Sequence, residues 1–190
     1  MAVVSESTVV RRDAIVEAAT SVFLRFGYRK TSMDDLARAA GLSRQGLYLH
    51  FATKDTLFAA GIDRLAVRSL AAAREALARD GQSPAERLLG AFTAFHGQFV
   101  GPASQHMSEL LEAATAILGK VPHDVQAEFL GEVVRVLKNG GVLAKWKDVG
   151  VTAKELAEQL NAMSTGWKHT VATSAEYRDR MRMATRLICG

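Results

Sequence analysis

What the sequence has little of sets the first limits on its class. Its 190 residues include a single cysteine, Cys189, and only three prolines, at positions 84, 102 and 122. One cysteine cannot form an internal disulfide, which fits a reducing cytoplasm. No apolar run approaches the about 18 residues of a membrane span, and Glu6 stands where a signal peptide would need apolar residues. We therefore expect a cytoplasmic protein with no membrane association.

Patterns that carry enzyme or metal chemistry are also missing. The histidines His96, His106, His123 and His169 do not follow metal-ligand spacing, and no cluster of cysteines and acids accompanies them. No Ser/His/Asp arrangement, glycine-rich phosphate loop or His-Glu-x-x-His motif occurs. The sequence therefore predicts no catalytic residue, no metal site and no cofactor. The net charge of +4 permits a polyanionic partner, but it is spread over the chain and does not single out a nucleic-acid domain.

Apolar residues recur at helical spacing along the whole chain, and alternating strand patterns are absent. The first helix is expected at about residues 11–26, and Gly27 ends it. Its apolar stripe is Ile15, Ala18, Ala19, Val22, Phe23 and Phe26. Thr31 or Ser32 can cap a second helix, with Asp34 or Asp35 in a capping-box relation, and Gly41 ends it. A fourth helix is expected from the cap at Thr53 to about Asp80.

The third helix is short and follows a turn of about three residues, Gly41–Leu42–Ser43, with Ser43 as N-cap. This spacing is typical of a helix-turn-helix, whose second helix enters the DNA major groove. At about 100° per residue, Arg44, Gln45 and Tyr48 share one arc. Leu47 and Leu49 fall outside that arc and are available for packing.

The residue types on this arc suit DNA. Arg44 can bind guanine edges and Gln45 adenine edges, while Tyr48 and His50 suit phosphate oxygens. Lys54, at the start of the next helix, also suits a phosphate. The alternative is a solvated polar face that binds nothing. Phe51 is expected in the core. The basic pair Arg11–Arg12 either solvates a helix start or forms an arm that reaches a minor groove.

Residues 11–58 resemble the DNA-binding domain of the tetracycline-repressor (TetR) family of transcriptional regulators. The matching run is AIVEAATSVFLRFGYRKTSMDDLARAAGLSRQGLYLHFATKDTLF. The resemblance implies nine or ten helices, a homodimer, a palindromic double-stranded DNA operator and release by an unknown small-molecule effector. It implies that Thr31, Tyr48, His50 and Lys54 contact phosphates and that Arg44 and Gln45 read bases. The candidate DNA-binding set is Thr31, Ser43, Arg44, Gln45, Tyr48, His50 and Lys54.

We therefore predict an all-α fold with two domains. Residues 1–58 would form a three-helix helix-turn-helix DNA-binding domain, and residues 59–190 a helical ligand-binding and dimerisation domain. A mostly apolar cavity is expected between the fifth and seventh helices. Its candidate ligand-binding residues are Phe92, Phe95, His96, Phe99, Met107, Glu109 and Trp146. Of the polar residues nearby, His96, Gln98, Gln105 or Glu109 would orient the ligand. The alternative is that the aromatic residues are ordinary core.

Two apolar stripes near the C-terminus predict a dimer interface. Its candidates are Leu156, Leu160, Met163 and Trp167 on one helix and Tyr177, Met181 and Ile188 on the next. These stripes either pack within one chain or join their copies in a four-helix dimer bundle, as is usual in the family that the chain resembles. The arginines on the other face of the last helix are expected to be solvated or salt-bridged at the dimer rim, rather than to form a second DNA site.

The sequence thus predicts a ligand-responsive transcriptional regulator, and it favours a repressor over an activator. Two alternatives stay open. One is a DNA-binding protein that responds to no ligand. The other is an all-helical carrier or enzyme with a vestigial DNA-binding head.

Overall fold

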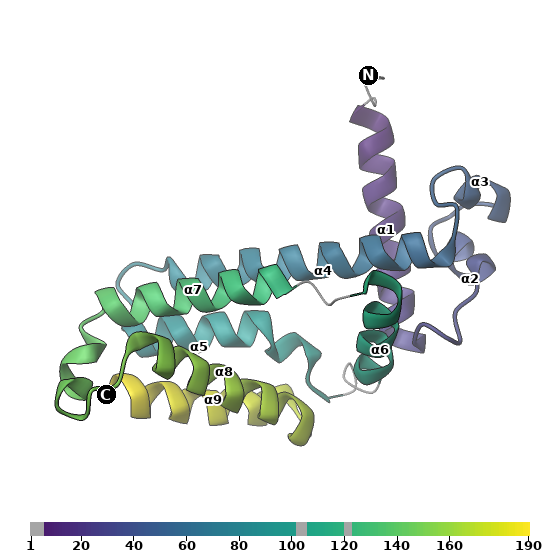
Figure 1. Ribbon diagram of the computed structural model, residues 1–190. Coiled ribbons are helices and arrows are strands. Elements are labelled where there is room, and N and C mark those ends of the chain that lie inside the picture. The colour runs from purple at the N-terminus through teal and green to yellow at the C-terminus, as the bar shows by residue number, and fades with distance from the viewer. Residues whose placement is uncertain (1–5, 102–105, 120–122) are drawn as a thin grey trace. The chain divides into compact units, whose positions relative to one another are not determined.

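The computed structural model describes residues 6–101, 106–119 and 123–190, and these residues form helices and connecting turns (Figure 1). The α-helices are α1 (Glu6–Phe26), α2 (Met33–Ala39), α3 (Arg44–Tyr48), α4 (Lys54–Leu77), α5 (Pro84–Phe95), α6 (Met107–Leu118), α7 (His123–Asn139), α8 (Ala153–Thr170) and α9 (Ser174–Cys189). Two 3-10 segments join them, η1 (Gly97–Phe99) and η3 (Val142–Val149). The all-α prediction is confirmed. Of the described helices, none combines the length and apolar character needed to cross a bilayer.

The chain divides into two compact units. The N-terminal unit comprises Met1–Ala66 and Gln105–Val121, and the C-terminal unit comprises Val67–Ser104 and Pro122–Gly190. The single helix α4 contributes its first half to one unit and its second half to the other. These compact units differ from the predicted boundary after residue 58, because the segment around α6 groups with the N-terminal unit. The division by function stays a prediction.

The core of the N-terminal unit forms where α1 to α4 present their apolar faces. Phe23 of α1, Leu36 of α2, Leu47 of α3 and Phe58 of α4 are all buried in one cluster. Helix α6 adds Leu110 and Ala114 to the same cluster, which explains why it belongs to this unit. The expected stripe of α1 holds except at its end, where Phe26 is 48% exposed.

The ends of these helices follow local sequence signals. Ser32 and Asp35 form a complete capping box at the start of α2, and the Ser43 side chain accepts the Gly46 amide hydrogen at the start of α3. Gly27 after α1 has φ of +82°, a left-handed conformation that favours glycine. The predicted caps of α2 and α3 are therefore confirmed, with Ser32 rather than Thr31 capping α2.

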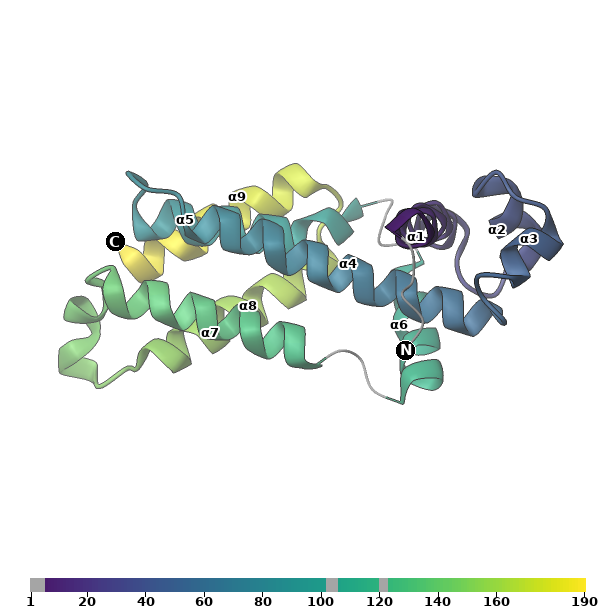
Figure 2. The ribbon, with the colours of Figure 1, turned by 90° about the horizontal axis from the view of Figure 1, so that it is seen from above.

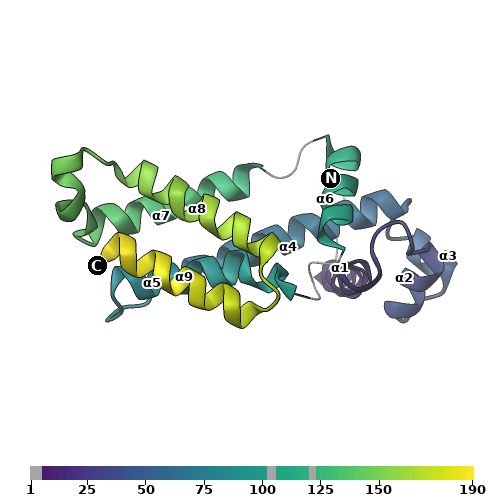
Figure 3. The ribbon, with the colours of Figure 1, turned by 90° about the horizontal axis from the view of Figure 1, so that it is seen from below.

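The C-terminal unit is a helix bundle in which α5 packs on α9, α7 on α8, and α8 on α9 (Figures 2 and 3). Aromatic rings fill its centre. The rings of Phe95 and Phe129 stack with centroids 4.1 Å apart, and Phe92 meets Phe129 edge to face at 5.0 Å. Such offset and edge-to-face contacts add to the stabilisation that burial of the rings provides.

The predicted dimer residues lie in this same core. The side chains of Leu156, Leu160, Tyr177, Met181 and Ile188 are at most 7% exposed within the single chain. Met163 and Trp167 pack partly buried against the same cluster. The structure therefore favours the first alternative for these stripes, packing within one chain. Because the five buried side chains already meet their own chain, they are not free to meet a second copy.

Candidate nucleic-acid interface

The helix-turn-helix is built from α2, α3 and the residues 40–43 between them. Leu47 of α3 is fully buried against the core, which fixes the rotation of this five-residue helix. Arg44 and Gln45 are exposed and Tyr48 is 42% exposed. The three side chains thus share the outward arc that the angular positions predict. Leu49, expected to pack, is instead 84% exposed, because the helix ends at Tyr48 and the chain turns there.

The Arg44 guanidinium is positioned by two neighbours. Its Nη1 lies 2.9 Å from Asp34 Oδ2 on α2, and its Cζ lies 5.8 Å from the centre of the Tyr48 ring. Exposed ion pairs of this kind contribute about 0–1 kcal/mol, so a nucleic acid could displace Asp34 at little cost. The arrangement holds Arg44 on the outer face without committing its full hydrogen-bonding capacity.

Lys54 connects the start of α4 to the turn between α1 and α2. Its Nζ donates to the carbonyl oxygens of Tyr28 at 3.2 Å and Thr31 at 3.1 Å, and it lies 4.1 Å from the Tyr28 ring centre. An ammonium group has three hydrogens, so one remains for a phosphate. Lys54 is therefore a positioning residue for the turn as well as a candidate phosphate contact.

Thr31 has a different place from the one that the family resemblance implies. Its side chain is buried, and its hydroxyl donates to the Gly27 carbonyl oxygen at 2.6 Å. A buried hydroxyl whose proton is already engaged cannot donate to a phosphate. The neighbouring Tyr28 hydroxyl donates to Asp55, and burial followed by the Asp55 hydrogen bond raises the pKa of Tyr28 to about 12. Thr31 and Tyr28 thus stabilise the turn rather than face outward.

The end of α3 is held by a residue whose contact sequence reasoning missed. Arg12 Nη1 donates to the His50 carbonyl oxygen at 2.7 Å, and its guanidinium lies 4.0 Å above the centre of the Phe51 ring. Phe51 is 1% exposed, as expected for a core residue. Arg12 also belongs to α1, so the structure places it in a helix and not in an extended arm. His50 is half-buried and Ser43 exposed, so both side chains remain reachable from solvent.

Glu109 of α6 is the other residue whose place the sequence did not reveal. Its carboxylate accepts the Arg29 backbone N–H at 2.7 Å and lies 3.9 Å from the His106 ring nitrogen. It therefore supports the turn after Gly27, in the N-terminal unit, and does not join Phe92 and its neighbours. No local pattern signals this contact, because the two residues that it joins are 80 positions apart.

The other predicted ligand-binding residues do not gather round one cavity in the described part of the chain. Phe92 and Phe95 are buried against other rings, Phe99 is half-buried in η1, and Trp146 in η3 donates its indole N–H to the Ile188 carbonyl oxygen at 2.9 Å. The side chains of Met107 and Gln98, and the whole of Gln105, lie outside the described residues. Close packing thus replaces the expected cavity at these rings.

His96 belongs to a buried hydrogen-bonded chain. Its Nδ1 lies 2.6 Å from Ser164 Oγ, which lies 2.6 Å from the Tyr177 hydroxyl, and that hydroxyl donates to the Phe92 carbonyl oxygen at 3.1 Å. The Phe92 carbonyl oxygen can only accept, so the single proton of the Tyr177 hydroxyl is used there. Ser164 therefore donates to Tyr177, and a neutral His96 donates to Ser164 from Nδ1. Burial, with the charges of Lys168 and His169, lowers the pKa of His96 to about 3. Burial raises the pKa of Tyr177 to about 12.

Known bacterial regulators resemble the N-terminal part of this chain. Residues 15–60 match the profile of the bacterial regulatory proteins of the tetR family. The chain is 36% identical over 85 residues to the transcriptional activator FasR of Mycolicibacterium smegmatis, covering 45% of this chain and 38% of FasR. It is 42% identical over 53 residues to the transcriptional repressor ComR of Escherichia coli, covering 28% of this chain and 25% of ComR. These matches thus span well under half of either relative.

Solved structures are similar over nearly the whole length. A TetR-like transcriptional regulator from Rhodococcus sp. RHA1 covers 93% of this chain, and 94% of that protein is covered, with a TM-score of 0.64 and 27% identity. The ketosteroid regulator KstR2 of Mycobacterium tuberculosis, at 17% identity, shares the fold with a TM-score of 0.63 and 95% of each chain covered. Residues 15–60 thus match the tetR family of bacterial regulatory proteins, and nearly the whole chain shares the fold of a TetR-like regulator.

Proposed function

We propose that this protein is a cytoplasmic transcriptional regulator that binds a palindromic operator in double-stranded DNA as a homodimer and is released by a small-molecule effector. The observation that carries the proposal is the outward face of α3, where Arg44, Gln45 and Tyr48 stand exposed over a buried Leu47. The named relatives include an activator and a repressor. Because a helix-turn-helix covers the DNA where it binds, repression is the simpler outcome. We propose no catalytic activity.

Base reading follows from the chemistry of the exposed face. An arginine binds guanine bidentately and a glutamine binds adenine bidentately, at about 1–3 kcal/mol of discrimination each. Arg44 would exchange its exposed pair with Asp34 for a base edge. Lys54, Ser43 and His50 would then contact the phosphates on either side of the groove.

A dimer brings two such faces to successive major grooves, which lie about 34–36 Å apart. Since the stripes of α8 and α9 are buried in their own chain, we propose that the copies meet on the exposed face of α9. There Met183 is 66% exposed and Leu187 is 75% exposed, one helical turn apart. Replacing Leu187 by glutamate should then produce monomers in light scattering, whereas Val149→Glu, at an exposed site in η3, should not.

A groove of about 830 Å³ in the C-terminal unit supports an apolar or amphipathic effector better than the filled aromatic centre does. It lies between α7, η3 and α8, and its lining includes Leu130, Val134, Leu143 and Val151, with Lys138 and Lys154 also present. Its volume is within the usual range for small-molecule sites. To change the ratio of the DNA-released to the DNA-binding conformation from 1:99 to 99:1, an effector must bind the released conformation more tightly by about 5.5 kcal/mol. The continuous helix α4, which has residues in both units, is the proposed connection.

The test is fluorescence anisotropy with duplex DNA from upstream of the protein's own gene, at several salt concentrations. Arg44→Ala should cost about 1–3 kcal/mol on the operator and relax its sequence preference. Lys54→Ala should weaken all duplexes alike and reduce the salt slope by about one unit. Arg135→Ala, at an exposed position on α7, serves as the control. Ligand binding without any salt-dependent DNA affinity would contradict the proposal and favour a carrier with a vestigial head.

A further inference from the structure

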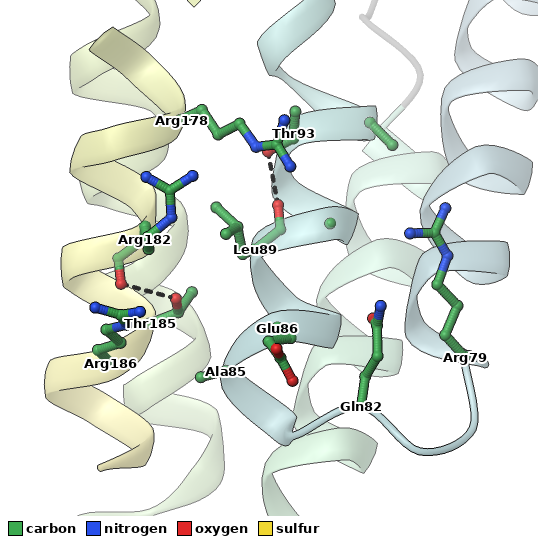
Figure 4. A pocket seen from close by; sticks show the side chains of 12 residues that line it. Arg79, Gln82, Ala85, Glu86, Leu89, Thr93, Arg178, Arg182, Thr185 and Arg186 are labelled. Atoms are coloured by element: carbon green, nitrogen blue, oxygen red, sulfur yellow. Dashed lines mark hydrogen bonds between the residues drawn. The ribbon is translucent and has the colours of Figure 1, made fainter. Parts of the chain in front are cut away.

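A second groove lies in the C-terminal unit, between α5 and α9 beside the end of α4 (Figure 4). It has a volume of about 500 Å³, which is ample for a small organic ligand. Leu89, Gly90 and Ala94 of α5 contribute an uncharged strip to its lining. The remaining lining residues are mostly polar or charged, in contrast to the apolar groove beside η3.

Four arginines surround this groove. Arg178, Arg182 and Arg186 occupy successive turns of α9, and Arg79 approaches from the other side of α5 (Figure 4). Residues four apart on a helix are about 6 Å apart along its axis. A monoanion could therefore contact one or two of these guanidinium groups, whereas a ligand with several anionic groups could contact more of them at once.

The pairing of these arginines differs from that of the other arginines in the described part of the chain. Most of the others pair with a carboxylate: Arg29, Arg38, Arg44, Arg64, Arg74, Arg135 and Arg180. Of the groove arginines, Arg182 pairs with Asp179. Arg79, Arg178 and Arg186 form no ion pair with any carboxylate that the structure describes. Like charges one turn apart destabilise a helix slightly, so α9 keeps this row at a small cost.

The one acid in the lining forms no ion pair with the row, because its carboxylate is engaged at the start of α5. Glu86 Oε2 accepts the backbone N–H of Ser83 at 2.8 Å and the Ser83 hydroxyl at 2.8 Å. These two hydrogen bonds lower the pKa of Glu86, and the charge of Arg186 adds to the effect. The hydroxyls of Thr93 and Thr185 donate to backbone carbonyls of their own helices. The arginines are thus the principal free donors facing the groove.

We propose that this groove is a binding site for a small organic molecule that carries two or more neighbouring anionic groups, such as a pyrophosphate or a polycarboxylate. Guanidinium groups bind both phosphate and carboxylate bidentately, and they do so more strongly than neutral donors. The strip of Leu89, Gly90 and Ala94 would contact the carbon part of the ligand. The proposal does not depend on DNA binding, since it concerns a surface of the C-terminal unit alone.

The test is isothermal titration calorimetry on the full chain with three probes at low ionic strength: inorganic pyrophosphate, ATP and citrate. We expect saturable binding of at least one probe that weakens as salt is raised. Arg178→Gln and Arg186→Gln should each weaken it about tenfold or more, as the loss of a charged hydrogen-bonding partner does. Both side chains are exposed, so circular dichroism should show unchanged folding. Comparison of the phosphate probes with citrate identifies which anion chemistry is preferred.

Two matched variants make the result specific. Arg135→Gln removes an arginine of α7 outside the groove, and Lys54→Gln removes a cation of the N-terminal unit. Both should leave probe binding unchanged. No saturable binding of any probe would overturn the proposal. The proposal would also fail if Arg135→Gln weakened probe binding as much as the groove variants do, or if only Lys54→Gln weakened it. It would fail too if duplex DNA displaced the probe and still did so in Lys54→Gln.

Discussion

The cations around the helix-turn-helix and those of the arginine groove are held in different ways. In the N-terminal unit, Arg44 pairs with Asp34, Lys54 donates to two backbone carbonyls, and Arg12 donates to a third. In the groove of the C-terminal unit, Arg79 and Arg178 have no described anionic partner. The difference agrees with the two proposals made above. In these, the first surface binds a rigid, repeating polyanion through positioned cations, and the second binds a small ligand through unpaired ones.

The interiors of the two units differ as well. The N-terminal core joins short helices through aliphatic and aromatic side chains, and most of its polar contacts lie at the surface. The C-terminal core surrounds the chain from His96 through Ser164 to Tyr177 with aromatic rings. A satisfied polar chain in a buried core specifies one arrangement, but it makes that core sensitive to any change that removes a partner. The three predictions below test these contrasts.

The largest effect is expected from Phe92→Ala. Phe92 is fully buried, so the change should lower the free energy of unfolding by about 3–5 kcal/mol, measured by urea denaturation. Phe26→Ala is the matched control. Because Phe26 is 48% exposed, its replacement should lower the free energy of unfolding far less. If Phe92 instead lined an open ligand cavity, the two losses would be similar, and the description of a filled centre would be wrong.

A smaller effect is expected from acid. The pKa of His96 falls from 6.5 to about 3 on folding, so between these values the unfolded chain binds more protons than the folded one. Stability therefore falls as the pH drops, by about 2 kcal/mol from this group between pH 7 and pH 5. Asparagine in His96→Asn keeps a donor for Ser164 but does not titrate. The stability of this variant should therefore fall less between pH 7 and pH 5 than that of the wild type. His169→Asn, at an exposed position, should change the profile less.

Other groups also respond to acid, which is why the variant comparison is needed. Hydrogen bonds at helix starts lower the pKa of Asp35, through the Ser32 side chain and then its backbone, and of Glu155, through the Thr152 backbone and then its side chain. Both groups favour the folded state above their unfolded pKa and lose that contribution as the pH falls. The difference between the wild-type and His96→Asn profiles isolates the histidine. Identical profiles would contradict the buried neutral assignment.

The parts of the structure that the sequence could predict are those that local chemistry decides. The cap at Ser43, the glycine after α1 and the inward Leu47 depend on residues within a few positions of one another. So does the arc of Arg44, Gln45 and Tyr48, because a helix fixes angles over short distances. This is why these features of the helix-turn-helix could be predicted, whereas the exposed Leu49 and the buried Thr31 could not.

The parts that the sequence could not predict depend on contacts between distant residues. An apolar stripe shows that a helix face is buried, but not against what, so the stripes of α8 and α9 fit a dimer bundle and an intrachain core equally well. Glu109 could be assigned to the N-terminal unit only once α6 was seen to pack with α1. The arginine groove likewise requires α5 and α9 to lie side by side, which no periodicity specifies.

The smallest effect tests the contact of Glu109 with the turn after α1. Gly27 and Gly41 both have positive φ, at +82° and +66°, so an alanine at either should cost about 1–2 kcal/mol. A Cβ at Gly41 would meet nothing within 4 Å, whereas one at Gly27 would lie 2.5 Å from Glu109 Oε2. Gly27→Ala should therefore displace that carboxylate and its bond to the Arg29 amide, at about 1 kcal/mol more than Gly41→Ala in urea denaturation.

A double-mutant cycle separates the clash from the backbone strain. Once Glu109→Ala has removed the carboxylate, Gly27→Ala should cost no more than Gly41→Ala does in the same background. The extra cost would then belong to the contact between α6 and the turn that carries Tyr28 and Thr31. The opposite result would be that Gly27→Ala costs more than Gly41→Ala by the same amount with and without the Glu109 carboxylate. The difference would then come from the two turns alone, and Glu109 would have no part in holding the DNA-binding surface in place.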